Sequence, residues 1–342
     1  MAIKIFTIGD PHSKKSNQAE LKICADKIAQ KITETQPDAI VILGDLADNH
    51  DRVYISALNG TVYFVDVICS AAAGLIKPAK VYYIIGNHDC ESNQIFLTDN
   101  HTFNAFKKWP NFIVVDKVLR LKTGTGPIVM CPYVPAGRFL EALDTIGRDR
   151  WADAKVIFCH QEFLGSKLSG LIASKSGDKW DDNNPMIISG HIHNYDRLQE
   201  NILYPGELMY SSFGDDDKPA RTISLFEIDG GKFPQETKID LGVLKKLTIN
   251  LTIDEAKEYV PPDNAHIRVN LTGTTQEHNE FKQTEKYAQL LAMVKIIPQH
   301  VDKIVVQRNT QRLGYLDILA KECEKEDEAV KEALQEVLNG DK

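Results

Sequence analysis

The first 90 residues of the chain alternate between short apolar runs and longer amphipathic segments. The runs are rich in Val and Ile, which favour strands, whereas Asn17–Thr35 has apolar residues at helical spacing. Pro37 and Asp38 end that helical pattern just before the next apolar run. Strands that alternate with helices favour a largely parallel sheet covered by helices, so the pattern predicts an α/β fold. The predicted strands are Ile3–Ile8, Ala39–Leu43, Val81–Ile85, Val156–Cys159 and Met186–Ser189, and the second predicted helix is Val53–Gly74.

The middle of the chain continues with shorter elements. The pattern predicts a short helix over residues 102–110 and a further helix over Arg138–Gly147. Phe112–Leu121 and Pro127–Tyr133 have the composition of strands. Residues 165–185 are rich in Gly, Ser, Lys and Asp, and we expect a long polar loop there, either a segment over a site or a surface insertion.

Changes in composition divide the chain into four parts. Residues 1–230 are expected to form the main domain, and residues 231–262, which end in two prolines, to form a connector. Residues 263–310 are expected to form a small α/β cap, and residues 311–342 a helical tail that either packs on its own chain or binds a partner. The cap is predicted from a strand, a helix and a strand at His266–Leu271, Glu277–Ile296 and Lys303–Gln307, and the tail from a helix at Leu316–Leu338.

The cysteines and the apolar stretches bear on location. Six scattered cysteines without a Cys-x-x-Cys pair indicate a reducing compartment rather than a disulfide scaffold or a cysteine zinc site. The chain starts with a strand pattern instead of a signal peptide. The apolar stretch at Val62–Ile76 is interrupted by Asp66 and Gly74, which makes it too short and polar for a membrane span. We therefore expect an intracellular, cytoplasmic protein that does not enter a membrane.

The net charge of −8 bears on the substrate. Affinity for a polyanion comes mostly from Lys and Arg, so this charge gives no support to tight DNA binding by this chain alone. Acidic metal ligands, whose charge bound cations would offset, and an acidic segment over residues 321–342 account for part of it. An enzyme acting on DNA with this charge would rely on a partner for its basic surface.

Each of the five predicted strands is followed directly by residues with oxygen or nitrogen donor atoms. In open α/β sheets, ligands bind at the carboxyl ends of the strands. Taken singly, an Asp after a strand is more often a helix cap and a lone His is more often packed, but five such strand ends together predict one site. The clusters are Asp10-Pro11-His12, Gly44-Asp45-Leu46-Ala47-Asp48, Gly86-Asn87-His88-Asp89, His160 and Gly190-His191-Ile192-His193.

These motifs, in this order, resemble the calcineurin-like metallophosphoesterase superfamily over roughly residues 1–230. Tyr204-Pro205-Gly206-Glu207, then Ser212-Phe213-Gly214-Asp215 and a predicted strand at Thr222–Ile228, are similar to the stretch that closes the nuclease domain of SbcD-type recombination nuclease subunits. The first motif departs from that narrower group, since bacterial members usually carry Trp at the position of Pro11. The departure leaves the expected metal ligands intact.

The resemblance implies a layered core of sheets and helices that holds two divalent metal ions at the strand ends. Asp45 would bridge the ions, because it follows the central strand. The mixed His, Asp and Asn donor set suits Mn²⁺, Fe²⁺, Zn²⁺ or Ni²⁺ better than Mg²⁺ or Ca²⁺, and Mn²⁺, which SbcD relatives generally use, is the expected metal. The other implied ligands are Asp10, His12 and His193 for one ion and Asn87, His160 and His191 for the second ion.

The resemblance also implies a proton donor. His88 would face the scissile phosphate and protonate the leaving oxygen, a role that suits a side chain whose pKa lies near neutrality. Asp48 is expected to be the acidic partner that fixes the His88 ring and keeps it protonated. Asp89 is expected to hold the loop.

The predicted function is that of a Mn²⁺-dependent DNA nuclease, exonuclease or endonuclease, in an SbcCD-like DNA repair and recombination complex. The implied partners are DNA, an SbcC-type coiled-coil ATPase and a second copy of the chain, with Val53–Gly74 as a possible dimer helix. The alternative is a small-molecule phosphodiesterase or phosphatase of the same superfamily, which the acidic net charge favours. Such enzymes often end soon after the last motif, whereas this chain continues for 149 residues (342 − 193). The intact ligand set counts against a non-enzymatic scaffold.

Overall fold

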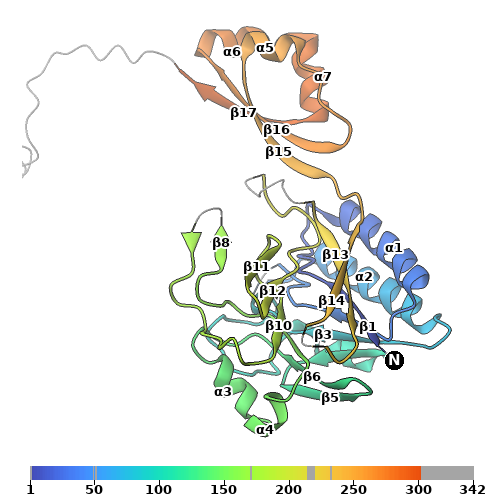
Figure 1. The fold of residues 1–342 in the computed structure, drawn as a ribbon. Helices are drawn as coiled ribbons and strands as arrows, with labels where there is room; N and C mark the ends of the chain where they lie inside the picture. Colours follow the sequence, from blue (N-terminus) through green and yellow to red (C-terminus); the bar gives the residue numbers. More distant parts are fainter. Residues whose placement is uncertain are drawn as a thin grey trace, which may run out of the picture.

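A computed structural model describes residues 2–48, 50, 52–169, 172–213, 220–231 and 233–301. In these residues the main part of the chain contains two six-stranded sheets, and a smaller part follows it (Figure 1). In strand order, the first sheet consists of β14 (Gln235–Asp240), β13 (Thr222–Ile228), β1 (Ile3–Ile8), β2 (Ala39–Ile42), β3 (Lys80–Ile84) and β4 (Phe112–Val115). The second sheet consists of β11 (Asp196–Gln199), β12 (Ile202–Tyr204), β10 (Met186–Ser189), β7 (Val156–Cys159), β6 (Gly126–Cys131) and β5 (Leu119–Thr123).

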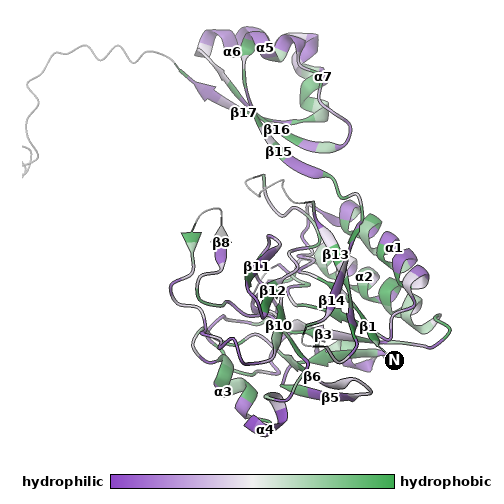
Figure 2. Cartoon of the chain, in the orientation of Figure 1, coloured by the Kyte–Doolittle hydropathy of each residue, from purple (hydrophilic) through white to green (hydrophobic). Residues whose placement is uncertain are grey.

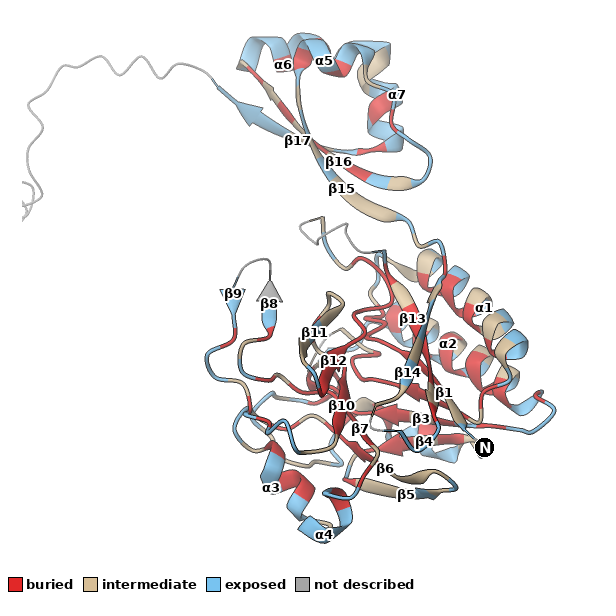
Figure 3. Ribbon diagram, in the orientation of Figure 1, coloured by how far each residue is buried: buried red, intermediate tan, exposed pale blue. Residues whose placement is uncertain are grey.

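The two sheets pack face to face, and helices cover their outer faces. Side chains alternate along β1, so Ile5 packs against the second sheet whereas Phe6 and Ile8 pack beneath the helices. The inner strands are accordingly apolar and buried along most of their length, whereas the edge strands β14, β11 and β5 are exposed or half-exposed (Figures 2 and 3). The covering elements are α1 (Gln18–Thr35), α2 (Ile55–Ala73) and the 3₁₀ helix η2 (Thr102–Lys108) on the first sheet, and α3 (Phe139–Asp144) and α4 (Arg148–Trp151) on the second. This layered α/β architecture confirms the predicted fold class.

The strands that carry the motifs run parallel to one another. β1, β2 and β3 are parallel in the first sheet, and β7 and β10 are parallel in the second. β13 runs antiparallel to β1, from Ile3 opposite Ile228 to Thr7 opposite Ser224, so the beginning of the chain pairs with a strand more than 200 residues away. Five carboxyl ends therefore meet at one end of the sandwich.

Helix α2 is the one helix among the described residues that is long and apolar enough to cross a membrane. Its Phe64, Val65 and Ile68 side chains are fully buried in the core, where the helix packs along α1. The core helix of a soluble protein satisfies the same criteria of length and composition, so α2 alone does not indicate a membrane span.

The smaller part is a parallel three-stranded sheet with helices on one face. Only residues 241–244 separate β14 from its first strand. Ile267, Val269 and Leu271 of the central strand point into a separate apolar core beneath the helices. Its elements are β15 (Lys245–Thr252), α5 (Ile253–Glu258), β16 (Ala265–Gly273), α6 (Thr275–Phe281), α7 (Glu285–Met293) and β17 (Lys295–His300).

The structure corrects the predicted elements after residue 230. The expected connector contains β14, β15 and α5. Both strands have one exposed or half-exposed face, so their sequences are too polar to signal strands. The expected helix Glu277–Ile296 is two helices that end at Met293, because Ile296 and Ile297 belong to a strand. The expected strand Lys303–Gln307 and the expected helix Leu316–Leu338 lie outside the described residues.

Three further expectations differ in detail. Phe112–Leu121 is two strands, because the chain turns at Asp116 and passes from the first sheet to the second. Arg138–Gly147 contains the short helix α3 and ends where Gly147 adopts a φ of 90° before α4. The expected loop at 165–185 contains a small hairpin of β8 (Lys167–Ser169) and β9 (Ile172–Ala173).

Candidate metal centre

All of the predicted site residues lie together at the end of the sandwich where the parallel strands finish. Asp10 and His12 follow β1, Asp45 follows β2, and Asn87 begins the short 3₁₀ helix η1 (Asn87–Asp89) after β3. His160 follows β7, and the last two histidines follow β10. Their potential ligand atoms converge in overlapping groups that bring together Asp10, His12, Asp45, Asp48, His88, His160, His191 and His193.

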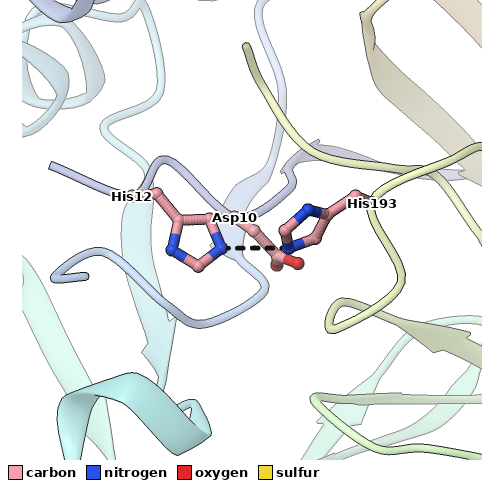
Figure 4. Close-up of side chains that lie close together, drawn as sticks. All are labelled: Asp10, His12 and His193. Atoms are coloured by element: carbon pink, nitrogen blue, oxygen red, sulfur yellow. Dashed lines mark hydrogen bonds between the residues drawn. The ribbon is translucent and has the colours of Figure 1, made fainter. Parts of the chain in front are cut away.

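The first group consists of Asp10, His12 and His193. Their ligand atoms all lie within 4.8 Å of one another. The Nε2 atoms of His12 and His193 are 3.2 Å apart and point toward each other above the Asp10 carboxylate (Figure 4). Asp10 and His12 are almost completely buried. Two imidazole nitrogens and a carboxylate that face one point are a typical arrangement for a bound cation.

The second group consists of Asp45, Asn87, His160 and His191. The amide oxygen Oδ1 of Asn87 lies 2.9 Å from His160 Nε2 and 2.9 Å from His191 Nδ1. The carboxylate oxygen Oδ2 of Asp45 lies 3.3 Å from the same His160 Nε2. These four donor atoms therefore face a common point, as the ligands of one ion would.

Asp45 lies between the two groups. Its Oδ2 is 3.3 Å from His160 Nε2 in the second group and 3.8 Å from His12 Nε2 in the first. Its other oxygen, Oδ1, accepts a hydrogen bond from the main-chain N–H of His88 at 2.9 Å. This position is the one that a bridging carboxylate would need.

Each of the four histidines has an oxygen atom near its outer ring nitrogen, and the geometry of a hydrogen bond is met for His160 and for His193, whose Nδ1 lies 3.2 Å from Ser211 Oγ. A hydrogen-bonded N–H on that outer nitrogen leaves a lone pair on the inner nitrogen, which is the form that binds metals. The outer contacts are His160 Nδ1 to the Leu43 carbonyl at 2.7 Å, His12 Nδ1 to Asp48 Oδ1 at 3.1 Å, His193 Nδ1 to Glu207 Oε2 at 3.3 Å and His191 Nε2 to Glu162 Oε2 at 3.8 Å.

The residues fit two divalent cations. Among the described residues, Oδ1 of Asp10 is buried without a hydrogen-bond partner, and the inner imidazole nitrogens of the first group face each other. Both features leave lone pairs directed at an enclosed point, which is unfavourable unless a cation is bound there. The donor set of imidazole, carboxylate and amide oxygen matches first-row divalent metals.

Comparison with known proteins decides the family. Residues 3–195 match the family model for calcineurin-like phosphoesterases, a range that includes every predicted ligand. The chain belongs to the calcineurin-like phosphoesterase family. A protein of Invertebrate iridescent virus 6 named "Putative phosphoesterase 244L" is 36% identical over 285 residues, which is 82% of this chain and 98% of that protein. "Putative phosphoesterase 078R" of Invertebrate iridescent virus 3 is 34% identical over 342 residues, 97% of this chain and 95% of that protein.

Solved structures are more distant. GAP50, described as the anchor in the inner membrane complex of Plasmodium, has 11% identity and a TM-score of 0.45 over 70% of this chain and 85% of that protein. TT1561 of Thermus thermophilus has 14% identity and a TM-score of 0.42 over 70% of this chain and 99% of that protein.

The backbone of this phosphoesterase is strained at the candidate ligands. His12, Asp45 and His191 have φ values of 42°, 47° and 80°, in the left-handed region that side chains other than glycine rarely adopt. Gly44, next to Asp45, has a φ of 113°, and a Cβ atom there would lie 2.3 Å from His160 Nδ1. Strain of this kind costs roughly 1–3 kcal/mol per residue and clusters at functional sites.

Asp89 joins two of the motif loops, as the sequence predicts. Its Oδ2 accepts hydrogen bonds from the main-chain N–H groups of Gly86 at 2.7 Å and Asp45 at 3.1 Å, and its Oδ1 accepts one from Ala47 at 3.2 Å. Burial raises the pKa of this carboxyl group to about 7, with a further contribution from the charge of Asp45. The group therefore holds the loops that carry Asp45 and Asn87 in a fixed relation.

His88 has a different partner from the one expected. Its Nδ1 lies 2.9 Å from the main-chain carbonyl of Asp48, whereas the Asp48 carboxylate lies beside His12 Nδ1 and 3.1 Å from Lys14 Nζ. Asp48 thus orients His88 through its main chain, because its side chain turns toward the first group. Burial lowers the pKa of His88, and His50 stacks on the ring with centroids 4.8 Å apart.

The field of the site attracts positive charge. Burial opposes protonation of His160, but the carboxylates of Asp45 and Asp10 outweigh it and raise its pKa to about 9. Burial opposes the charged form of Asp45 as well, yet the neighbouring histidines lower its pKa, so it stays ionised. A site that stabilises a proton in this way also stabilises a metal cation.

Sequence reasoning missed two carboxylates that lie beside the histidines and an arginine that pairs with one of them. Glu162 lies near His191, while Glu207 lies next to His193 and forms an ion pair with Arg221. Glu207 belongs to the Tyr204–Glu207 motif, which carries the resemblance to SbcD-type subunits. That resemblance gives no role to the Glu207 carboxylate. Glu162 and Arg221 stand outside every motif, and no sequence signal singled them out.

Proposed function

We propose that this phosphoesterase is a Mn²⁺-dependent DNA nuclease that resembles SbcD-type subunits. The observation that supports hydrolysis of a phosphodiester is the pair of ligand groups on either side of Asp45. Two divalent cations, when bound, neutralise the phosphate and supply a hydroxide at neutral pH. The protein's own task is to hold these ligands in place and to supply a proton for the leaving oxygen.

His88 is the proposed proton donor. With Nδ1 directed at the Asp48 carbonyl, its Nε2 is the nitrogen available to substrate. The His88 ring also lies edge-on to the ring of His12, with centroids 5.2 Å apart, so it borders the first group. A proton donor at this place would act on an oxygen that leaves the phosphate on that side.

The cap supports a polymeric substrate over a small one. Its first strand packs against the segment that follows Glu207: Lys246 donates a hydrogen bond to the Tyr210 carbonyl, and Thr248 donates one to the Phe213 carbonyl at 2.9 Å. Arg268 of the next strand lies over the Phe213 ring, 5.0 Å from its centroid. The cap is thus anchored beside the loop that carries His193, where a long substrate would contact both parts.

A small-molecule phosphodiesterase is the second candidate. The net charge of −8 favours it, because an acidic protein has little attraction for a polyanion. The two viral relatives are named as phosphoesterases, and one of them matches 97% of this chain, without indicating a nucleic-acid substrate.

One experiment separates the two candidates. Linear single- and double-stranded DNA and bis-p-nitrophenyl phosphate are each incubated with the full chain and Mn²⁺. We expect hydrolysis of both kinds of substrate. Hydrolysis of the small ester alone would reject the nuclease and favour the second candidate, and hydrolysis of neither would reject the phosphodiesterase proposal.

An SbcC-type ATPase is the proposed partner, since it would add a basic surface to a chain whose net charge is −8. The proposal depends on the tail at 311–342, which lies outside the described residues.

A further inference from the structure

A buried chain of charged groups runs from His193 away from the candidate metal centre. His193 Nδ1 lies 3.3 Å from Glu207 Oε2, and Glu207 Oε1 lies 3.0 Å from Arg221 Nη2. The Glu207 and Arg221 side chains are only 1% and 2% exposed. The main chain adds a second connection, since the Glu207 N–H donates to the His193 carbonyl at 3.0 Å. Glu207 therefore fixes both the backbone and the ring of this ligand.

Further contacts hold Glu207 and Arg221 in place. Ser211 Oγ donates a hydrogen bond to Glu207 Oε2 at 2.6 Å and lies 3.2 Å from His193 Nδ1. Arg221 Nη1 donates to Asn194 Oδ1 at 2.8 Å, and the guanidinium group lies over the Tyr210 ring at 4.6 Å. Removing two charges from water is costly, so a buried ion pair is weak evidence for a role in stability alone. The pair is better explained by its contact with His193.

The two ligand groups differ in what supports their histidines. In the first group, His193 has the Glu207 carboxylate with Arg221 behind it, and His12 has the Asp48 carboxylate with Lys14 behind it. In the second group, His160 donates to the neutral Leu43 carbonyl.

The second histidine of that group, His191, lies 3.8 Å from Glu162, which is beyond hydrogen-bond distance. A carboxylate beside the outer nitrogen increases the basicity of the inner nitrogen, and for His193 that carboxylate is Glu207, 3.3 Å away.

We propose that Glu207, held by Arg221 and Ser211, is a positioning residue that selectively strengthens binding of the cation at Asp10, His12 and His193. This inference rests on the proposed two-metal function, and it assigns a positioning role to a residue that is not itself a candidate ligand.

The test is a Mn²⁺ titration of the metal-free full chain, with free Mn²⁺ followed by electron paramagnetic resonance. The wild-type protein should bind two ions. Glu207→Gln keeps the shape of the side chain but removes its charge. Glu207→Gln should lower the affinity for one ion by about 10- to 100-fold, the usual cost of losing such a support. The affinity for the other ion should stay within about threefold of the wild-type value.

Glu236→Gln is the matched control. Glu236 is another carboxylate, on the edge strand β14 of the first sheet, and its hydrogen bonds in the described part of the chain come from Tyr195 at 2.9 Å and Ser224 at 2.7 Å rather than from a candidate ligand. Its titration curve should overlay that of the wild type. The melting temperature of each metal-free variant, measured beside the titration, shows whether the fold is retained.

The outcomes separate the inference from the proposed function. Fewer than two ions on the wild type contradict the two-metal function itself. Two ions on the wild type with an unchanged Glu207→Gln curve contradict only the role of Glu207, as does equal weakening of both ions. If Glu207→Gln does not fold, Ser211→Ala is the deciding variant. Losing one hydrogen bond to the Glu207 carboxylate should lower the affinity for the same ion roughly 2- to 10-fold. A titration curve that does not change overturns the inference.

Discussion

The two carboxylate oxygens of Asp45 face different neighbours. One accepts a hydrogen bond from the main chain of His88, and the other lies near a histidine of each ligand group. Asp45→Asn removes the negative charge between the two groups but keeps a similar shape. We expect hydrolysis of bis-p-nitrophenyl phosphate to be abolished while the circular dichroism spectrum stays native. Activity within tenfold of the wild type at matched Mn²⁺ would contradict the bridging assignment.

His88 contributes chemistry rather than binding in the proposed mechanism. His88→Gln should therefore retain bound Mn²⁺ and lower turnover on DNA by roughly 10²–10⁴, the usual contribution of a positioned general acid. The loss should be smaller on a p-nitrophenyl ester, whose leaving group needs little protonation. Equal losses on both substrates, or loss of bound metal, would assign the residue a structural or ligand role.

Asp89 predicts a pH dependence of stability. Its pKa is raised by burial from 3.8 to about 7, so the folded state favours the protonated form. The stability that this group contributes is fully present below about pH 4 and is lost as the pH rises to about 7, an effect on the order of a few kcal/mol. Asn cannot ionise, so the melting temperature of the metal-free wild type, relative to Asp89→Asn, should fall between pH 4 and pH 7. A difference that is constant across this range would contradict the assignment.

At the scale of elements, the loops after the strands depend on close packing between glycine and the ligands. Gly44→Ala would force a Cβ atom to within 2.3 Å of His160 Nδ1 at a φ of 113°, which side chains rarely adopt. We expect a loss of several degrees in melting temperature and weaker Mn²⁺ binding. Gly124→Ala is the control, because a Cβ atom there meets nothing within 4 Å. Equal effects of the two substitutions would show that His160 is not displaced.

The sequence predicts the motif-bearing strands well for a physical reason. β1, β7 and β10 were predicted with their observed bounds, because strands buried on both faces are continuous apolar runs that end sharply in polar residues. The donor atoms at those ends meet because parallel strands of both sheets finish at the same end of the sandwich. Strand order follows from pairings across the chain and had to come from the structure.

Other features have no local signal. The half-exposed strand β15 alternates in burial, so its residues look like a polar connector. The Asp48 carboxylate lies beside His12 and Lys14 rather than His88, which the spacing of the motif does not predict. Glu162 and Arg221 likewise reach the site through tertiary packing alone.

At the scale of the whole molecule, the acidic net charge predicts that this chain supplies the hydrolytic site while a partner supplies affinity for long duplex DNA. Deleting residues 316–342 should leave Mn²⁺-dependent activity on short single-stranded DNA nearly unchanged and abolish co-purification with an SbcC-type ATPase, because apolar anchors at helical spacing would bind the partner. ATP-stimulated activity on long duplex DNA should disappear with it. A deletion of residues 339–342, which spares the predicted helix, is the control. Unfolding or loss of basal activity in the longer deletion would show that the segment belongs to the core of this chain.

The pairing of β1 with β13 has a consequence for how the protein is made. Asp10 is synthesised 183 residues before His193 (193 − 10), and β13, the strand that pairs with β1, ends at Ile228. At about 5–20 residues per second, this interval lasts roughly 10–40 s, during which one edge of β1 stays open. The nascent chain cannot assemble either complete ligand group in that time. Cation binding by a complete ligand group therefore has to follow the synthesis of His191 and His193.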